Sequence, residues 1–149
     1  MKIQKLRDVE TPVRGTELSA GLDFFVPNDW EKEEVTLQPN EAILIESGIK
    51  VDVPKGFVLV GFNKSSKAVK KNLQLGACVI DEDYQGEVLI HIRNVGTTPI
   101  TIERGKSIAQ FVLLPVFYDD IEVVEGELFK KKSERGEGKL GSTDKKLKK

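Results

Sequence analysis

Hydrophobic and polar residues alternate along most of the chain. In the segment VLIHIR (residues 88–93), every second residue is aliphatic, so a strand would place those side chains on one face. Similar segments, separated by Gly, Pro, Asn or Asp, predict further strands: KIQKL, DFFVP, EVTL, AILIESGIKVDV, FVLVGF, LQLGACVI, PITIE, SIAQFVLLPVF and DIEVVE. Many short strands at close spacing indicate an all-β sandwich or barrel.

Only one segment favours a helix. KSSKAVKKN (residues 64–72) is rich in Lys and Ala, and Ser65 or Ser66 is expected to cap a short helix there. No repeat of 20 to 50 residues is visible.

The composition changes near Glu125. From there to Lys149 the chain has few apolar residues, several glycines and many lysines. This composition is typical of a flexible tail, so we expect a β-barrel domain over residues 1–125 and a flexible arm over residues 126–149. Composition alone favours a disordered end that improves solubility over an arm with a role in a site.

Charge and cysteine content narrow the classes of partner. The 149 residues include 23 Lys plus Arg against 24 Asp plus Glu, so no overall field favours a nucleic-acid or membrane partner. The single Cys78 excludes an intramolecular disulfide, and no apolar run reaches the length of a membrane span or resembles a signal peptide. The expected location is the cytoplasm, or the host cytoplasm for a viral chain.

Two familiar chemistries can be excluded. GKS at residues 105–107 does not complete a phosphate loop, because the first glycine of that pattern would fall on Ile100. His91 is the only histidine, which excludes a histidine-rich metal cluster.

The segment GACVIDEDYQGEV (residues 76–88) places acids and a tyrosine between two predicted strands, as if at the tip of a hairpin. Such residues are also ordinary in turns, so the segment alone leaves its role open. Four other segments give it a context. In chain order, the five are AGLDFFV (20–26), NKSSKAVKKNL (63–73), ACVIDEDYQGEV (77–88), GKSIAQFVLLPV (105–116) and RGEGKLGSTD (135–144).

These five segments resemble, in order and in residues, the five motifs of the trimeric dUTPase family, the dUTP diphosphatases. The resemblance implies a distorted β-barrel or jelly-roll protomer and a homotrimer whose active sites are shared between chains. It implies hydrolysis of dUTP to dUMP and pyrophosphate by in-line attack of water on the α-phosphorus, with Mg²⁺ bound mainly through the phosphates. This reaction would limit uracil incorporation into DNA and supply dUMP.

The resemblance also implies roles for individual residues. Asp81 would be the general base for the attacking water, and the Tyr84 ring would pack against the deoxyribose and exclude a 2′-hydroxyl. Main-chain groups would read uracil, because strand-edge amides and carbonyls offer a fixed pattern of donors and acceptors. The residues expected to line the uracil are Gly76, Ala77, Cys78, Val79, Ile80 and Leu89.

Two further groups would hold the phosphates. Those on the barrel are Lys64, Ser65, Ser66 and Gln110, and those on the arm are Arg135, Gly141, Ser142 and Thr143. Leu140, also on the arm, would cover the uracil. Asp23 could hold Mg²⁺ through water, or it could equally be a buried carboxylate satisfied by backbone amides.

The chain departs from the family pattern at five positions. Lys64 replaces the usual Arg, which keeps the charge but loses the bidentate fork. Ser66, Cys78 and Lys139 stand where glycine is usual or common, and Leu140 replaces a phenylalanine.

Two other functions remain open at this point. A dCTP deaminase shares the fold and the paired serines, but its catalytic glutamate would fall on His91 of this chain. A non-catalytic trimer that binds dUTP as a regulatory signal would explain the altered arm.

Overall fold

The computed structural model describes residues 1–140, and its contacts divide the chain into two units, Met1–Phe117 and Tyr118–Lys149. The division falls before the boundary expected at residues 125 and 126, because the last strand already ends at Pro115. Among the described residues, no helix is long and apolar enough to cross a bilayer.

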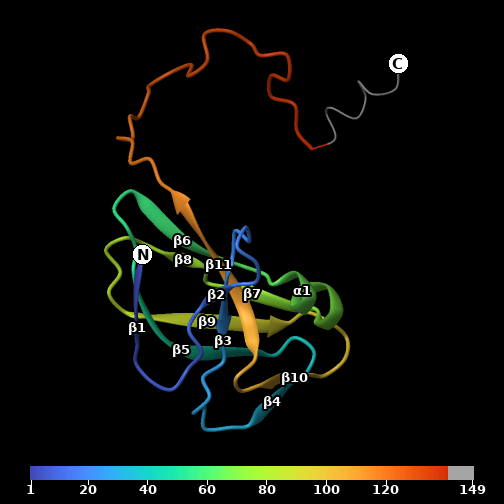
Figure 1. Ribbon diagram of the computed structural model, residues 1–149. Coiled ribbons are helices and arrows are strands. Elements are labelled where there is room, and N and C mark those ends of the chain that lie inside the picture. Colours follow the sequence, from blue (N-terminus) through green and yellow to red (C-terminus); the bar gives the residue numbers. More distant parts are fainter. Residues whose placement is uncertain (141–149) are drawn as a thin grey trace. The chain divides into compact units, whose positions relative to one another are not determined.

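Unit 1 is built almost entirely of strands, as predicted (Figure 1). Its elements are β1 (Lys2–Lys5), β2 (Val13–Arg14), β3 (Leu22–Phe25), β4 (Glu34–Leu37), β5 (Ala42–Asp52), β6 (Phe57–Phe62), α1 (Ser65–Lys71), β7 (Leu73–Gly76), β8 (Val79–Ile80), β9 (Glu87–Asn94), β10 (Ile100–Glu103) and β11 (Ser107–Pro115). The strands pair antiparallel in three sheets, with orders β1-β5-β9-β7, β2-β3-β11-β6-β8 and β10-β4. The arrangement is jelly-roll-like and does not close into one barrel, which confirms the all-β class.

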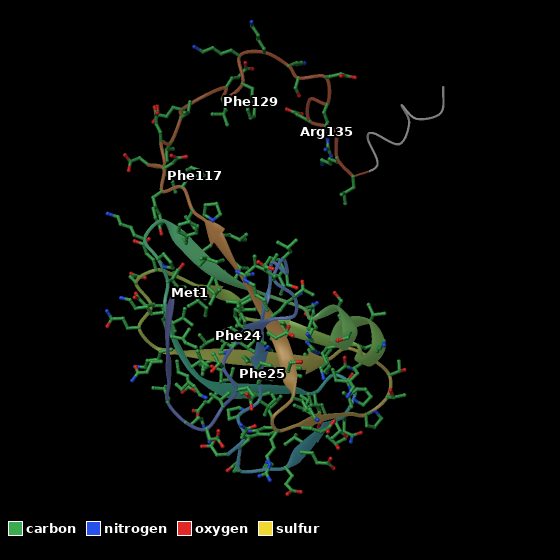
Figure 2. All side chains as sticks on the ribbon, viewed as in Figure 1. Met1, Phe24, Phe25, Phe117, Phe129 and Arg135 are labelled. Atoms are coloured by element: carbon green, nitrogen blue, oxygen red, sulfur yellow. The ribbon has the colours of Figure 1, made fainter. Side chains whose placement is uncertain are left out.

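The core lies between the inner faces of the two larger sheets. The alternation predicted for residues 88–93 is confirmed, because Val88, Ile90 and Ile92 are buried while Leu89 faces outward. Phe24 of β3 and Phe111 of β11 are both buried, with ring centroids 4.6 Å apart, and Figure 2 shows Phe24 among the strands of unit 1. Aromatic side chains of this size contribute strongly to such a core.

The segment LQLGACVI, predicted as one strand, forms two strands in different sheets. β7 pairs with β9, so that Gly76 lies opposite His91, whereas β8 pairs with β6, so that Ile80 lies opposite Leu59. Between them Ala77 has a φ of 52°, a left-handed conformation that interrupts the strand. The expected hairpin is therefore a wide loop, residues 77–86, that leaves one sheet and pairs with the other.

Two local predictions were wrong. Helix α1 has Lys64 at its N-cap and no side-chain cap hydrogen bond, so neither Ser65 nor Ser66 caps it. Residues 120–125 do not form a strand, because their alternating side chains find no sheet: Ile121 is 94% exposed and Val123 is 87% exposed. The described part of unit 2, residues 118–140, contains no helix or strand.

Candidate active site

Residues from three of the five segments meet beside the end of β6. The Lys64 Nζ lies 2.5 Å from Asp23 Oδ2, and both side chains are mostly covered. Gln110 of β11 pairs in register with Asp23 on one side and with Phe62 on the other. The sheet thus brings together an ammonium group, a carboxylate and a carboxamide that lie far apart in sequence.

An open depression of about 580 Å³ lies next to this group, lined in part by Ala20, Gly21 and Gln110. Gly21 leaves room for the Gln110 side chain, since a Cβ there would lie 2.5 Å from Gln110 Oε1. Ser65 and Ser66 are exposed in the first turn of α1. Lys64, Ser65, Ser66 and Gln110 thus offer a cation, hydroxyls and an amide in one region of the chain, although of the four only Gln110 lines the depression. Groups of these types suit a phosphate chain.

Asn63 holds this region together, and it was not among the candidate site residues predicted from the sequence. Its backbone carbonyl accepts a 2.8 Å hydrogen bond from Gln110 Nε2, and its Oδ1 accepts a 2.7 Å hydrogen bond from the amide of Leu75. Asn63 therefore links β11 to β7, the strand that leads into the 77–86 loop. Its place at the start of segment 63–73, directly before Lys64, is the sequence feature that could have drawn attention to it.

The residues expected to read uracil lie at the start of the 77–86 loop. Gly76 ends β7, and the Cys78 carbonyl accepts a 2.7 Å hydrogen bond from the Gly61 amide. Val79 is 61% exposed, whereas Ile80 is buried and can offer only its main chain. Burial raises the pKa of the Cys78 thiol, which favours its neutral form.

Asp81 and Tyr84 form a turn at the middle of the same loop. The Tyr84 amide donates a 3.2 Å hydrogen bond to the Asp81 carbonyl, and the Tyr84 hydroxyl donates a 2.9 Å hydrogen bond to the Glu87 carbonyl. The Asp81 side chain is exposed, and among the described residues no hydrogen bond or ion pair occupies its carboxylate. It is therefore free to accept a hydrogen bond from water.

Two glutamates anchor this loop, and neither was selected from the sequence. Glu82 Oε2 accepts a 2.5 Å hydrogen bond from the Gly56 amide, and Glu87 Oε1 accepts one of the same length from the Gly48 amide. These bonds fix the loop on both sides of Tyr84 before any ligand is present. Their partners are distant in sequence, so no local signal could have identified them.

The two groups of residues lie toward opposite ends of β6. Ile80, which directly precedes Asp81, is opposite Leu59, whereas Gln110 is opposite Phe62. At about 3.3 Å per residue, these two positions are separated by roughly 10 Å along β6. One chain thus carries both groups without joining them at one point.

The arm residues are only partly described. Arg135 Nε donates a 3.3 Å hydrogen bond to the Gly138 carbonyl, and Figure 2 labels Arg135 in unit 2. Leu140 is fully exposed. The expected arm residues Gly141, Ser142 and Thr143 lie outside the described residues.

Within residues 1–140, no group of three His, Cys, Asp or Glu side chains could hold a metal ion. Asp23, for which binding of Mg²⁺ through water was one of two expected roles, contacts Lys64. The donor set fits Mg²⁺ only as an ion carried largely by phosphates and water, because Mg²⁺ commonly binds protein through one or two carboxylates.

The jelly-roll-like fold, the exposed Asp81 carboxylate on an anchored loop and the separate group of Lys64, Asp23 and Gln110 are compatible with a nucleoside triphosphate hydrolase. The model of the dUTPase family matches residues 7–144. The chain belongs to the dUTPase family.

Curated relatives cover nearly the full chain. The deoxyuridine 5′-triphosphate nucleotidohydrolase of Hydrogenobaculum sp. is 33% identical over 144 residues, which cover 95% of each chain. That of Pseudomonas putida is 38% identical over 133 residues, covering 87% of this chain and 84% of its own. The structure of the dUTPase of Staphylococcus bacteriophage 80alpha with dUPNHPP has a TM-score of 0.82 at 27% identity and covers 95% of this chain and 96% of its own.

Proposed function

We propose that this chain hydrolyses dUTP to dUMP and pyrophosphate, with Asp81 holding the water that attacks the α-phosphorus. Membership of the dUTPase family carries the reaction. The observation that carries the assignment of Asp81 is its carboxylate, which is exposed and unpaired among the described residues, on a loop fixed by Glu82 and Glu87. A fixed base contributes by orienting the water in line and accepting its proton.

Tyr84 and the main chain before Asp81 would select the nucleoside. The Tyr84 hydroxyl is engaged with the Glu87 carbonyl, so the ring is held in one orientation and is 41% exposed. A ring held there would pack against the deoxyribose and leave no room for a 2′-hydroxyl. Gly76 to Ile80 and Leu89 would read the uracil through backbone groups, and buried polar groups left unpaired by cytosine would penalise dCTP.

The phosphates would bind to Lys64, Ser65, Ser66 and Gln110. The ammonium of Lys64 would exchange its contact with Asp23 for one with a phosphate oxygen, or would share both. Arg135, Leu140, Gly141, Ser142 and Thr143 would cover the substrate from the arm. Mg²⁺, when bound, would neutralise phosphate charge, and Asp23 is the residue that could reach it through water.

The separation of the two groups supports a homotrimer with shared sites. In-line attack requires the reacting atoms within about 3 to 3.5 Å of each other, so Asp81 and the phosphate-binding residues must both lie close to one triphosphate. In a single chain they lie toward opposite ends of β6. A head-to-tail contact that closes into a ring would bring Asp81 of one copy to Lys64 of the next.

The first experiment replaces Asp81 by Asn. Asp81→Asn should keep the fold and bind dUTP but hydrolyse it at least about 10²-fold more slowly, because Asn keeps the shape and loses the base. Asp83→Asn is the matched control, since Asp83 is an exposed aspartate of the same loop with no proposed chemistry. Turnover of Asp81→Asn close to that of Asp83→Asn would remove Asp81 from this role.

Mixing variants tests the shared sites. Light scattering should give about 50 kDa, three times the chain mass of 16.6 kDa. Asp81→Asn mixed with a chain truncated after Lys132 should regain activity, because some sites would draw each intact part from a different chain. In the control mixture, the truncated chain also carries Asp81→Asn. No chain of that mixture has an intact Asp81, so it should stay inactive. A fully active monomer would contradict shared sites.

The alternatives are not favoured. The curated relatives described above are named nucleotidohydrolases, and His91 stands where a deaminase would need its glutamate. The work on the phage 80alpha protein describes phage dUTPases that control transfer of virulence genes, and that role is a property of those proteins. A cytoplasmic location of this chain stays a prediction.

A further inference from the structure

We infer that His91 is a specificity-determining residue whose ring N–H faces the 4-position carbonyl of uracil. The inference rests on the proposed function, because it assumes that Gly76 to Ile80 and Leu89 surround the base. Neither the reaction nor the five segments assign any role to this side chain.

His91 lies between the two segments expected to contact the base. It is directly opposite Gly76 on β7 and opposite Leu44 on β5, and it follows Leu89 on the same outward face of β9. The imidazole leans over Gly76, since a Cβ on that glycine would lie 2.6 Å from His91 Nδ1. The missing side chain of Gly76 therefore gives the imidazole its position.

The polar atoms of this imidazole have no protein partner. The ring is half-buried, and among residues 1–140 the structure gives His91 no hydrogen bond or ion pair. Its neighbour Leu44 is apolar. The imidazole is half-buried, its N–H has no protein partner among the described residues, and it lies next to the segment expected to bind the base. It is therefore suited to donate a hydrogen bond to an acceptor atom of the ligand.

The direction along β9 indicates which edge of the base it reaches. Tyr84, expected at the sugar, bonds to the carbonyl of Glu87 at the start of β9. Leu89 and then His91 lie progressively further along the strand, at about 3.3 Å per residue. The sugar is attached at N1 of the pyrimidine, and the 4-position is on the opposite side of the ring. His91 is therefore nearest the group in which uracil, with a carbonyl, differs from cytosine, with an amino group.

The donor chemistry of an imidazole N–H gives the preference. An N–H donor facing the 4-position pairs with the carbonyl of uracil and opposes the amino group of cytosine, which is also a donor. One neutral hydrogen bond of this kind contributes about 0.5 to 1.5 kcal/mol, which corresponds to roughly 2- to 12-fold in affinity.

The test compares two substitutions that separate the donor from the ring. His91→Phe keeps a ring over Gly76 and removes the N–H, whereas His91→Gln supplies an amide N–H without the ring. His91→Phe should raise the KM for dUTP roughly 2- to 12-fold with kcat unchanged, and should lower the dUTP-to-dCTP ratio of kcat/KM by the same factor. His91→Gln should stay within about 3-fold of the parent on both measures. Thermal unfolding and light scattering confirm that both variants keep the parent fold and assembly.

Two results would overturn the inference. One is a His91→Phe variant with the parental KM and the parental selectivity. The other is a His91→Gln variant that loses as much as His91→Phe, since the N–H would then be irrelevant. Calorimetry with dUMP distinguishes failure of the inference about His91 from failure of the proposed hydrolysis of dUTP. It measures the effect of His91 on base binding even if the parent does not hydrolyse dUTP, and equal dUMP affinity in parent and His91→Phe would again refute the inference.

Discussion

The contact between Asp23 and Lys64 allows a quantitative prediction of stability. Lys64→Met should lower the free energy of unfolding, because it leaves a carboxylate whose side chain is only 18% exposed without its cation. Exposed ion pairs contribute about 0.2 to 1 kcal/mol, and hydrogen bonds to charged groups about 1.5 to 3 kcal/mol. The Lys64 side chain is also only 25% exposed. We therefore expect the interaction between Lys64 and Asp23 to contribute about 1 to 2 kcal/mol to stability, between the values for those two kinds of contact.

A double-mutant cycle measures this coupling. Urea denaturation of the parent, Lys64→Met, Asp23→Asn and the double variant gives the four unfolding free energies, at one protein concentration because assembly affects apparent stability. Lys70→Met is the matched control: Lys70 is an exposed lysine of the same helix without an ion pair among the described residues, and its loss should change stability by less than about 0.5 kcal/mol. A coupling energy below about 0.3 kcal/mol would refute the reasoning.

The remaining predictions concern single positions around the site. Gly21→Ala should raise the KM for dUTP by roughly 2- to 12-fold, because its Cβ would displace Gln110, and steady-state kinetics showing no change would contradict a role for that amide. Leu140→Phe should lower the KM several-fold and Leu140→Ala should raise it, since an aromatic ring covers more of a base; a Leu140→Ala variant equal to the parent would withdraw Leu140 from the site. At about pH 8, iodoacetamide should react more slowly with Cys78 than with the free thiol of glutathione, because burial raises the pKa of the Cys78 thiol. Bound dUMP should slow the reaction of Cys78 further, as followed by mass spectrometry, and an unchanged rate with dUMP would place the thiol away from the base.

Most of the fold could be predicted from the alternation of side chains. The pattern located β5, β6 and β9, and burial alternates most regularly along β9. It failed at residues 120–125, because alternation shows only that a strand would have an apolar face and not that a sheet is present to receive it. It also missed the change of sheet at Ala77, since a positive φ in an alanine has no sequence signal.

The candidate site could be located in the sequence only through its resemblance to dUTPase motifs. Composition and spacing alone left the acids of residues 81–83 as ordinary turn residues. The positions of Asn63, Glu82 and Glu87 depend on amides that are distant in sequence, so their roles became visible only in three dimensions. His91 was evident as the only histidine, but its unpaired imidazole beside Gly76 was not.

The anchoring of the 77–86 loop determines when its conformational entropy is lost. Holding a backbone residue in one conformation costs about 1 to 2 kcal/mol, and the bonds from Glu82 and Glu87, with the pairing of β8 to β6, already meet that cost when the chain folds. A nucleotide that binds this loop therefore does not have to order it again. The affinity for the nucleotide base should therefore depend on the contacts that the loop makes with it. Substitution of Glu82 or Glu87 should weaken binding because the loop would then lose entropy on binding, even though the residues that contact the base are unchanged.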